Sequence, residues 1–217
     1  MKITVTVVSS LLLASCSTVG GDEPEMRFGE FSRQLSNFDE VMLERRPELQ
    51  LNDGSSVQNC RDYLDLDSGV DVSESVENIT RSADYRICDT LRALKSADPV
   101  SQPYRSNVAA GEVLRNRLDL RSFRSSLGPA SSRYHTFAQI EEELPVRVEG
   151  DSVILESDDW YLHLEVVARA DVNGDGNEDW LVWLTDEARS GNYRGYDVLA
   201  IDHVAREGLL EADSIGK

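Results

Sequence analysis

Oxygen-bearing side chains stand at alternate positions in a short stretch near the carboxyl end of the chain. Residues 171 to 179 run DVNGDGNED. Calcium is a hard cation that takes about six to eight oxygen ligands, and this spacing lets a chain wrap round a single ion. We expect calcium to be coordinated by the side chains of Asp171, Asn173, Asp175 and Asp179 and by the backbone carbonyl of Asn177. The residues leave one alternative open, an Asx- and Gly-rich hairpin turn that binds no metal.

The sixth position of this stretch is Gly176, which suits a sharp turn with positive φ. Val182 stands where an EF-hand has its bidentate glutamate, so the stretch is not an EF-hand. With the following strand WLVWL it resembles the strand-flanked Asp-x-Asn-Gly-Asp-Gly-x-x-Asp loops of FG-GAP and VCBS repeat proteins. The resemblance occurs once and spans about fifteen residues. It therefore implies calcium binding and not the propeller architecture of those families.

A short apolar run, Val5 to Leu13, follows Lys2 and leads into Leu13-Ala14-Ser15-Cys16. The run is too short to span a bilayer, which takes about 20 apolar residues, and it suits the h-region of a secretory signal. The four residues resemble the lipobox of bacterial lipoproteins. This resemblance implies a signal peptide over residues 1–15 and a mature N-terminus at Cys16 that carries diacylglycerol and an amide-linked acyl chain such as palmitate. The alternative is an ordinary signal peptide with a chance cysteine near its end.

Within the lipoprotein family, a serine rather than an aspartate after the lipidated cysteine favours the outer membrane. Ser17 therefore implies a lipid-anchored protein of the outer membrane, on its periplasmic side or at the cell surface. The formal net charge of −18 argues against nucleic acids and anionic lipid surfaces as partners. We expect the lipid to be the membrane contact and a protein of the cell envelope to be the partner.

If Cys16 carries lipid, the remaining cysteines are Cys60 and Cys88. The periplasm is oxidising, so we expect them to form a disulfide, which would stabilise the fold by about 3–4 kcal/mol in the chain-entropy model. The alternative is a redox pair, although no Cys-x-x-Cys motif supports it.

The elements that position these residues change in type along the chain. Residues 16–25 predict a flexible tether, and residues 26–132 a mainly helical region. Its expected helices cover residues 28–42, 56–66, 82–97 and 108–118, by apolar spacing of three and four. Residues 133–217 predict an antiparallel β region with strands at 145–149, 152–156, 160–170, 180–185 and 196–203.

Helices followed by strands predict an α+β fold. We expect a disulfide-stapled helical part followed by an antiparallel meander that carries the calcium-type loop, with both parts able to share one domain. A hairpin turn is expected at Gly150-Asp151. Along residues 160–170 the apolar side chains alternate, which places Trp160 on the same face as Leu162 and Leu164.

Other residues offer weaker signals for function. Tyr193, Arg194 and Tyr196 form a candidate contact surface, because Tyr and Arg are enriched at binding hot spots, and the alternative is a plain hairpin loop. His163 and His203 lie on predicted strands and could face one another across the sheet. No nucleophile elbow, phosphate loop or zinc-protease motif is present. We expect a non-enzymatic binding or envelope-assembly module. The alternative is a periplasmic hydrolase whose catalytic groups converge only in the fold.

Overall fold

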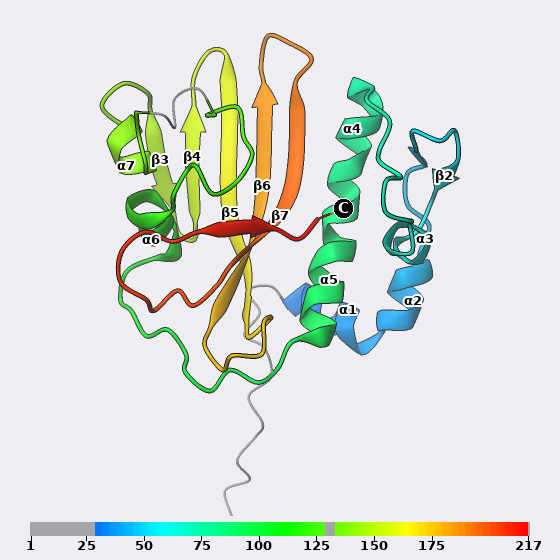
Figure 1. Cartoon of the computed structure of the whole chain (residues 1–217), viewed down its shortest axis with the longest axis horizontal. Helices are drawn as coiled ribbons and strands as arrows, with labels where there is room; N and C mark the ends of the chain where they lie inside the picture. The colour runs from blue at the N-terminus through cyan, green and yellow to red at the C-terminus, as the bar shows by residue number, and fades with distance from the viewer. Residues whose placement is uncertain (1–28, 129–132, 217) are drawn as a thin grey trace, which may run out of the picture.

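A computed structural model describes residues 29–128 and 133–216 and has an α+β fold (Figure 1). Its main feature is a six-stranded antiparallel sheet in which each strand pairs with its neighbours in sequence. The strands are β3 (Val146–Glu149), β4 (Ser152–Glu156), β5 (Trp160–Ala170), β6 (Asp179–Ala188), β7 (Arg194–Ile201) and β8 (Ala212–Ser214). The predicted antiparallel meander is confirmed, and the short strand β8 extends it.

Strand β5 contributes to hydrophobic clusters on both faces of the sheet. Leu162 and Leu164 belong to the cluster on one face, while Ala168 and Ala170 belong to the cluster on the other. A register shift between Val166 and Ala168 marks a β-bulge, which exchanges the faces of the residues beyond it. The lower half of the strand in Figure 1 is therefore covered on both sides.

One face of the sheet packs against α6 (Ala110–Arg117) and α7 (Phe137–Ile140). The start of α6 lies against the β3–β4 turn, where Gly111 N donates to Gly150 O at 3.1 Å. The carboxylate of Asp151 in the same turn accepts from Ala110 N at 3.3 Å, and so satisfies a free N–H group at the helix start. Gly150 has φ of +61°, as the expected tight turn requires.

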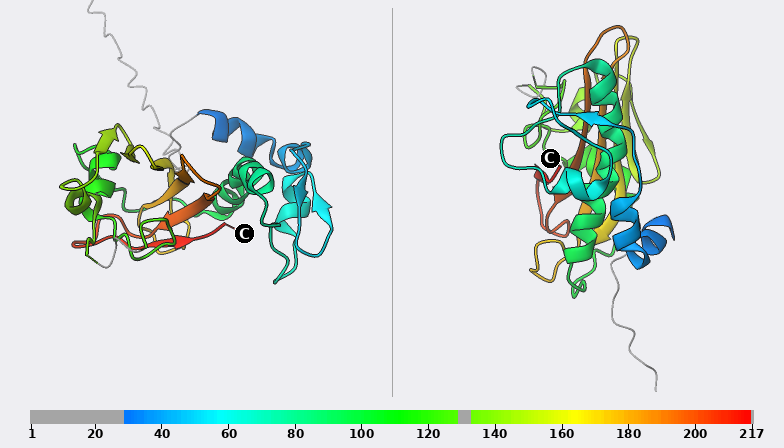
Figure 2. Two further views of the ribbon diagram at one scale, coloured as in Figure 1. Left: turned by 90° about the horizontal axis from the view of Figure 1, so that it is seen from above. Right: turned by 90° about the vertical axis from the view of Figure 1, so that its right-hand side faces the viewer.

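The amino-terminal part stands on the β7 side of the sheet, away from α6 and α7 (Figures 1 and 2). Its helices are α1 (Gly29–Ser36), α2 (Phe38–Leu43), α3 (Cys60–Leu64), α4 (Val76–Ser82), the 3₁₀ turn η1 (Ala83–Tyr85) and α5 (Arg86–Ser96). A two-stranded sheet of β1 (Leu49–Gln50) and β2 (Ser56–Val57) lies between α2 and α3. Apart from α4, these helices share one hydrophobic cluster with β5, β6 and β7.

The predicted disulfide between Cys60 and Cys88 is confirmed. It joins α3 to α5, and both cysteines are fully buried. The two helices expected to carry the cysteines are therefore linked covalently, as predicted.

Several helix bounds differ from those expected. The apolar stripe over 28–42 forms two helices that meet at Asn37, whose φ of −113° is not helical. Ser56 and Val57 pair with β1, and α3 begins later because the side chain of Asn59 accepts from Asp62 N. Residues 76–96 form α4, η1 and α5, so helix begins upstream of the predicted residue 82, after Ser75 as N-cap. None of the helices in the described ranges is long and apolar enough to cross a membrane.

Candidate functional site

The predicted calcium loop connects β5 to β6, at the lower end of the sheet in Figure 1. Both glycines that the loop needs have positive φ, +78° at Gly174 and +85° at Gly176. A segment from another part of the chain packs against it, since Ser101 N and Gln102 N both donate to Gly176 O, at 3.0 and 2.9 Å. The loop is thus held by residues 101–102 as well as by its own turns.

Asp171 organises the first half of the loop. Its Oδ1 accepts hydrogen bonds from Gly174 N at 2.8 Å and Asp175 N at 3.1 Å, and its Oδ2 accepts from Gly176 N at 2.7 Å. The side chain is 2 % exposed. This carboxylate therefore folds the backbone around itself.

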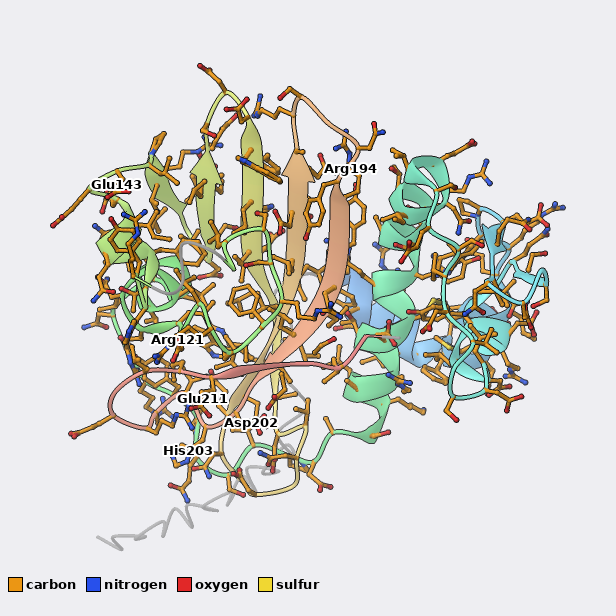
Figure 3. The ribbon with its side chains drawn as sticks, turned by 45° about the horizontal axis from the view of Figure 1, so that its top comes forward. Arg121, Glu143, Arg194, Asp202, His203 and Glu211 are labelled. Carbon is orange, nitrogen blue, oxygen red and sulfur yellow. A yellow bond between two sulfur atoms is a disulfide. The ribbon has the colours of Figure 1, made fainter. Side chains whose placement is uncertain are left out.

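Asp179 closes the second half. Its Oδ2 accepts from Val172 N at 3.0 Å, and its Oδ1 accepts from His203 N at 2.8 Å. Figure 3 shows His203 and Asp202 at the end of the sheet where the loop lies, opposite Arg194. Asp179 thereby joins the loop to the segment that follows β7.

Asn173 and Asp175 lie on the outside of the loop and are exposed, whereas Asn177 is half-buried. Asn173 Oδ1 accepts from Asp175 N at 2.9 Å, and Asp175 Oδ1 accepts from Asn177 N at 2.8 Å. These two hydrogen bonds are local Asx turns. All five predicted ligands therefore lie in one loop, with two buried anchors and a more accessible outer side.

The loop concentrates negative charge. No ion pair joins Asp171, Asp175 or Asp179 to a cation within the ranges that the structure describes. Burial, with a smaller contribution from the charges of Asp202 and Asp175, raises the pKa of Asp179 to about 6, against the hydrogen bonds from His203 N and Val172 N that lower it. Hydrogen bonds from Asn177 lower the pKa of Asp175. The loop thus gathers three carboxylates that form no ion pair with the described residues.

The chemistry of this donor set fits a hard cation, because every predicted ligand atom is oxygen. The arrangement is more open than a closed metal cage. Within the described residues, no group of three or more His, Cys, Asp or Glu side chains is arranged to hold a metal ion. An ion would therefore have to draw on Asn173 and the Asn177 carbonyl as well as on the aspartates.

Two acidic residues beside the loop are not among the predicted ligands, Glu178 within the stretch and Asp98 outside it. Glu178 is 3 % exposed and accepts from Trp180 Nε1 at 2.8 Å and from Tyr104 N at 3.1 Å. Asp98 N donates to Asp171 O at 2.9 Å. Asp98 is remote in sequence, so no local spacing signals its place beside the loop.

The three residues of the predicted contact surface have different environments. Arg194 Nη1 donates to the carbonyls of Ala188 and Tyr193, at 2.6 and 2.7 Å, and so supports its own hairpin. Tyr196 is half-buried, its hydroxyl bonds to Glu187, and the Arg86 guanidinium lies 5.4 Å from its ring centroid. Tyr193 is 44 % exposed. Of the three, Tyr193 is the one that offers a large exposed ring.

Trp160 is the partner of Tyr193 that the sequence did not indicate. The two ring centroids are 5.8 Å apart at an interplanar angle of 67°, and Trp160 is 37 % exposed. Alternation along residues 160–170 gives the face of Trp160 but not its exposure. As the first residue of β5 it lies at the strand end, beside the β6–β7 hairpin.

A cavity of about 210 Å³ lies between α4, α5 and β7. Its polar lining already has protein partners. Asp89 accepts from Tyr63 Oη at 3.1 Å, and Asp197 accepts from Ser214 Oγ at 2.9 Å. Burial raises the pKa of Asp197. We interpret these polar groups as links between helices and sheet.

The histidines do not converge. His163 pairs with Thr185 in the middle of the sheet, whereas β7 ends at Ile201 and His203 follows it in the loop region. His163 and His203 therefore do not face one another across the sheet, because the last predicted strand ends two residues earlier than expected. Cys16 and the signal peptide lie outside the described residues.

Comparisons of the chain with protein families, with curated proteins and with solved structures find no match.

Proposed function

We propose that this chain is a lipid-anchored binding or assembly module of a bacterial outer membrane, facing the periplasm or the cell surface. In this proposal the 171–179 loop holds a structural calcium ion, and the protein acts by binding a partner rather than by catalysis. The lipid is attached at Cys16.

The observation that carries the proposal is that each of the three cysteines has an assigned role, one in lipid attachment and two in a disulfide. The lipobox residues Leu13-Ala14-Ser15-Cys16 assign one cysteine to lipid, and the other two form a disulfide. Structural disulfides persist in oxidising compartments such as the periplasm. The three cysteines are thus all accounted for by an exported lipoprotein.

Support for the calcium ion comes from the charge and chemistry of the loop. Buried Asp171 and Asp179 lie in an all-oxygen donor set, together with the more exposed Asn173 and Asp175. A divalent cation would stabilise the charged form of the Asp179 carboxylate, which burial disfavours. Extracellular calcium modules typically bind at about 10⁻⁴–10⁻³ M, which suits an ion that stabilises structure.

Expression of the full chain in a Gram-negative host tests the proposal. We expect the protein in the outer-membrane fraction, with an N-terminus at Cys16 and a lipid-sized increase in intact mass. The Cys16→Ala chain should lack that increase and stay uncleaved. A wild-type protein with free Ser17 at its N-terminus, or one that retains Met1, would contradict the lipid anchor.

A further inference from the structure

Two exposed aromatic rings lie together at the end of the sheet opposite the 171–179 loop. They belong to neighbouring hairpins, with Trp160 at the start of β5 and Tyr193 in the turn before β7. Their ring centroids are 5.8 Å apart. We call these two residues, with the adjacent Asp158 and Asp159, the aromatic tip.

Hydrogen bonds fix the position of this aromatic tip. The Tyr193 hydroxyl donates to Asp186 Oδ2 at 3.2 Å, and Asp186 is almost fully buried. Arg189 N donates to Asp159 O at 2.7 Å and so ties the two hairpins together. Rings held in this way lose little conformational freedom when they bind a partner.

The charge around the rings is acidic. Residues 156–160 and 186–194 carry five acids against two arginines, namely Glu156, Asp158, Asp159, Asp186 and Glu187 against Arg189 and Arg194. Both arginines are engaged, Arg189 with Glu156 and Arg194 with hairpin carbonyls. Arg147, which also pairs with Glu156, and Arg124 near Tyr193 add two positive charges, so the remaining negative charge beside the rings lies on Asp158 and Asp159.

Asp158 and Asp159 are exposed, and neither forms an ion pair with a cation of the described part of the chain. The Asp159 side chain accepts from Ser190 Oγ at 3.2 Å. Two uncompensated carboxylates therefore precede Trp160 directly.

We propose that the aromatic tip binds a lysine- or arginine-containing segment of a partner protein. A cation lies favourably over the face of an aromatic ring, best over tryptophan, and the two carboxylates attract the same charge. Trp, Tyr and charged neighbours also provide the rigid anchors found at protein hot spots. The inference rests on the proposed function in taking the domain to be a binding module.

The probe is a fluorescent peptide of alternating lysine and glycine, titrated by anisotropy against the full-chain protein isolated from its host. Trp160→Ala should weaken binding roughly fivefold, as expected for loss of one cation–π contact. Trp160→Phe should retain part of the affinity, and Asp158→Asn with Asp159→Asn should weaken binding and reduce its salt dependence.

The matched control removes two acids elsewhere, by Glu211→Gln with Asp213→Asn in and beside β8. These variants should change the affinity less than twofold. An equal loss in the control would overturn the proposal in favour of general attraction to an acidic protein. Salt-independent, Trp160-dependent binding of a neutral oligosaccharide, with no binding of the peptide, would overturn it in favour of a glycan surface.

Lipidation is measured separately on the same preparation by intact mass. If the lipid is absent and the peptide binds, the lipid-anchor proposal is contradicted and the proposal for the aromatic tip is supported. If the lipid is present and the peptide does not bind, the proposal for the aromatic tip is contradicted and the lipid-anchor proposal is supported.

Discussion

At the scale of single residues, the carboxylates of the 171–179 loop divide into two kinds. Asp171 and Asp179 are buried and hold backbone N–H groups of several residues, so their loss would unfold the loop with or without an ion. Asp175 is exposed and accepts its backbone hydrogen bond from Asn177, two residues away. Asp175 is therefore the residue whose removal tests calcium binding with the least damage to the fold.

We predict that about 5 mM calcium raises the melting temperature of the wild-type protein above its value in chelator. With a dissociation constant of about 0.1–1 mM, mass action gives about 1–2 kcal/mol. That corresponds to a shift of roughly 2–8 °C for a domain of this size. Asp175→Ala should abolish the shift, whereas Asp67→Ala, at an exposed site outside the loop, should retain it. Equal wild-type melting temperatures with calcium and with chelator would contradict the metal.

The lowered pKa of His163 predicts that the stability of the folded protein decreases in acid. Burial lowers its pKa from 6.5, and Arg86 lowers it further, while Glu165 opposes the shift. Since the folded protein holds this proton less tightly than the unfolded chain, unfolding takes up a proton as the pH falls below about 6.5. The contribution of His163 to stability is thus fully present above pH 6.5 and is lost as the pH falls toward the folded pKa.

We predict that His163→Gln reduces this acid sensitivity. The difference in unfolding free energy between wild type and variant should fall between pH 7 and pH 5, with a slope of at most about 1.4 kcal/mol per pH unit for one proton. Urea titrations at each pH measure the difference, in which common effects such as that of Asp179 cancel. Tyr161→Phe, which keeps the neighbouring ring, should behave as wild type. A difference that does not change with pH would refute the role assigned to His163.

At the scale of elements, α6 is positioned by one close backbone approach. A Cβ added at Gly111 would lie 2.3 Å from Ser152 O and 2.8 Å from Gly150 O. Both atoms belong to the backbone of the β3–β4 hairpin, so neither can move without shifting the strands.

Gly111→Ala should therefore destabilise the protein by about 1–3 kcal/mol or more, although alanine favours helix. Gly128→Ala is the matched control, because its added Cβ would meet Ser125 O at an ordinary 3.5 Å. Chemical denaturation measures both variants. A Gly111→Ala protein as stable as wild type would show that the helix can slide away from the hairpin.

Sequence patterns are sufficient to predict the bounds of some strands and insufficient for others. The bounds of β4 and β5 match the predicted ones, because alternating apolar residues and turn signals define them locally. The β5 bulge had no signal, since Val166 and Val167 are both apolar and both buried. Strand β8 has three residues, too few for a periodic pattern.

The same limit applies to the candidate sites. The spacing from Asp171 to Asp179 placed the loop between two strands and the positive φ of Gly176 correctly, whereas the positive φ of Gly174 was not predicted. Asp98 and the backbone of His203 reach the loop from other segments, so local spacing could not reveal them. The contact between Trp160 and Tyr193 depends on the register between β5 and β6, which places the β4–β5 and β6–β7 hairpins side by side. Neither hairpin alone contains this information.

At the scale of the whole molecule, the helical part and the sheet share one hydrophobic cluster. Trp183 on β6 lies at their junction, with Nε1 donating to Thr90 Oγ1 at 2.9 Å and its ring 6.1 Å from that of Phe31. Arg86 of α5 also donates to Leu184 O at 3.1 Å. The two parts predicted from sequence therefore bury a common hydrophobic cluster and are joined by hydrogen bonds.

The disulfide tests whether the two parts unfold together, because it lies in the helical part, whereas Trp160 and Trp180 lie on sheet strands and Trp183 lies at the junction. Cys60→Ala with Cys88→Ala should lower the unfolding free energy by about 3–4 kcal/mol, since the bond closes a loop with a sequence separation of 28. The melting temperature should fall by on the order of 10 °C. Because both parts bury the same cluster, circular dichroism at the helical minimum and tryptophan fluorescence should shift together in a single transition. A fluorescence transition that stays at the wild-type temperature while the helical signal melts early would show that the sheet folds independently of the disulfide-bonded part.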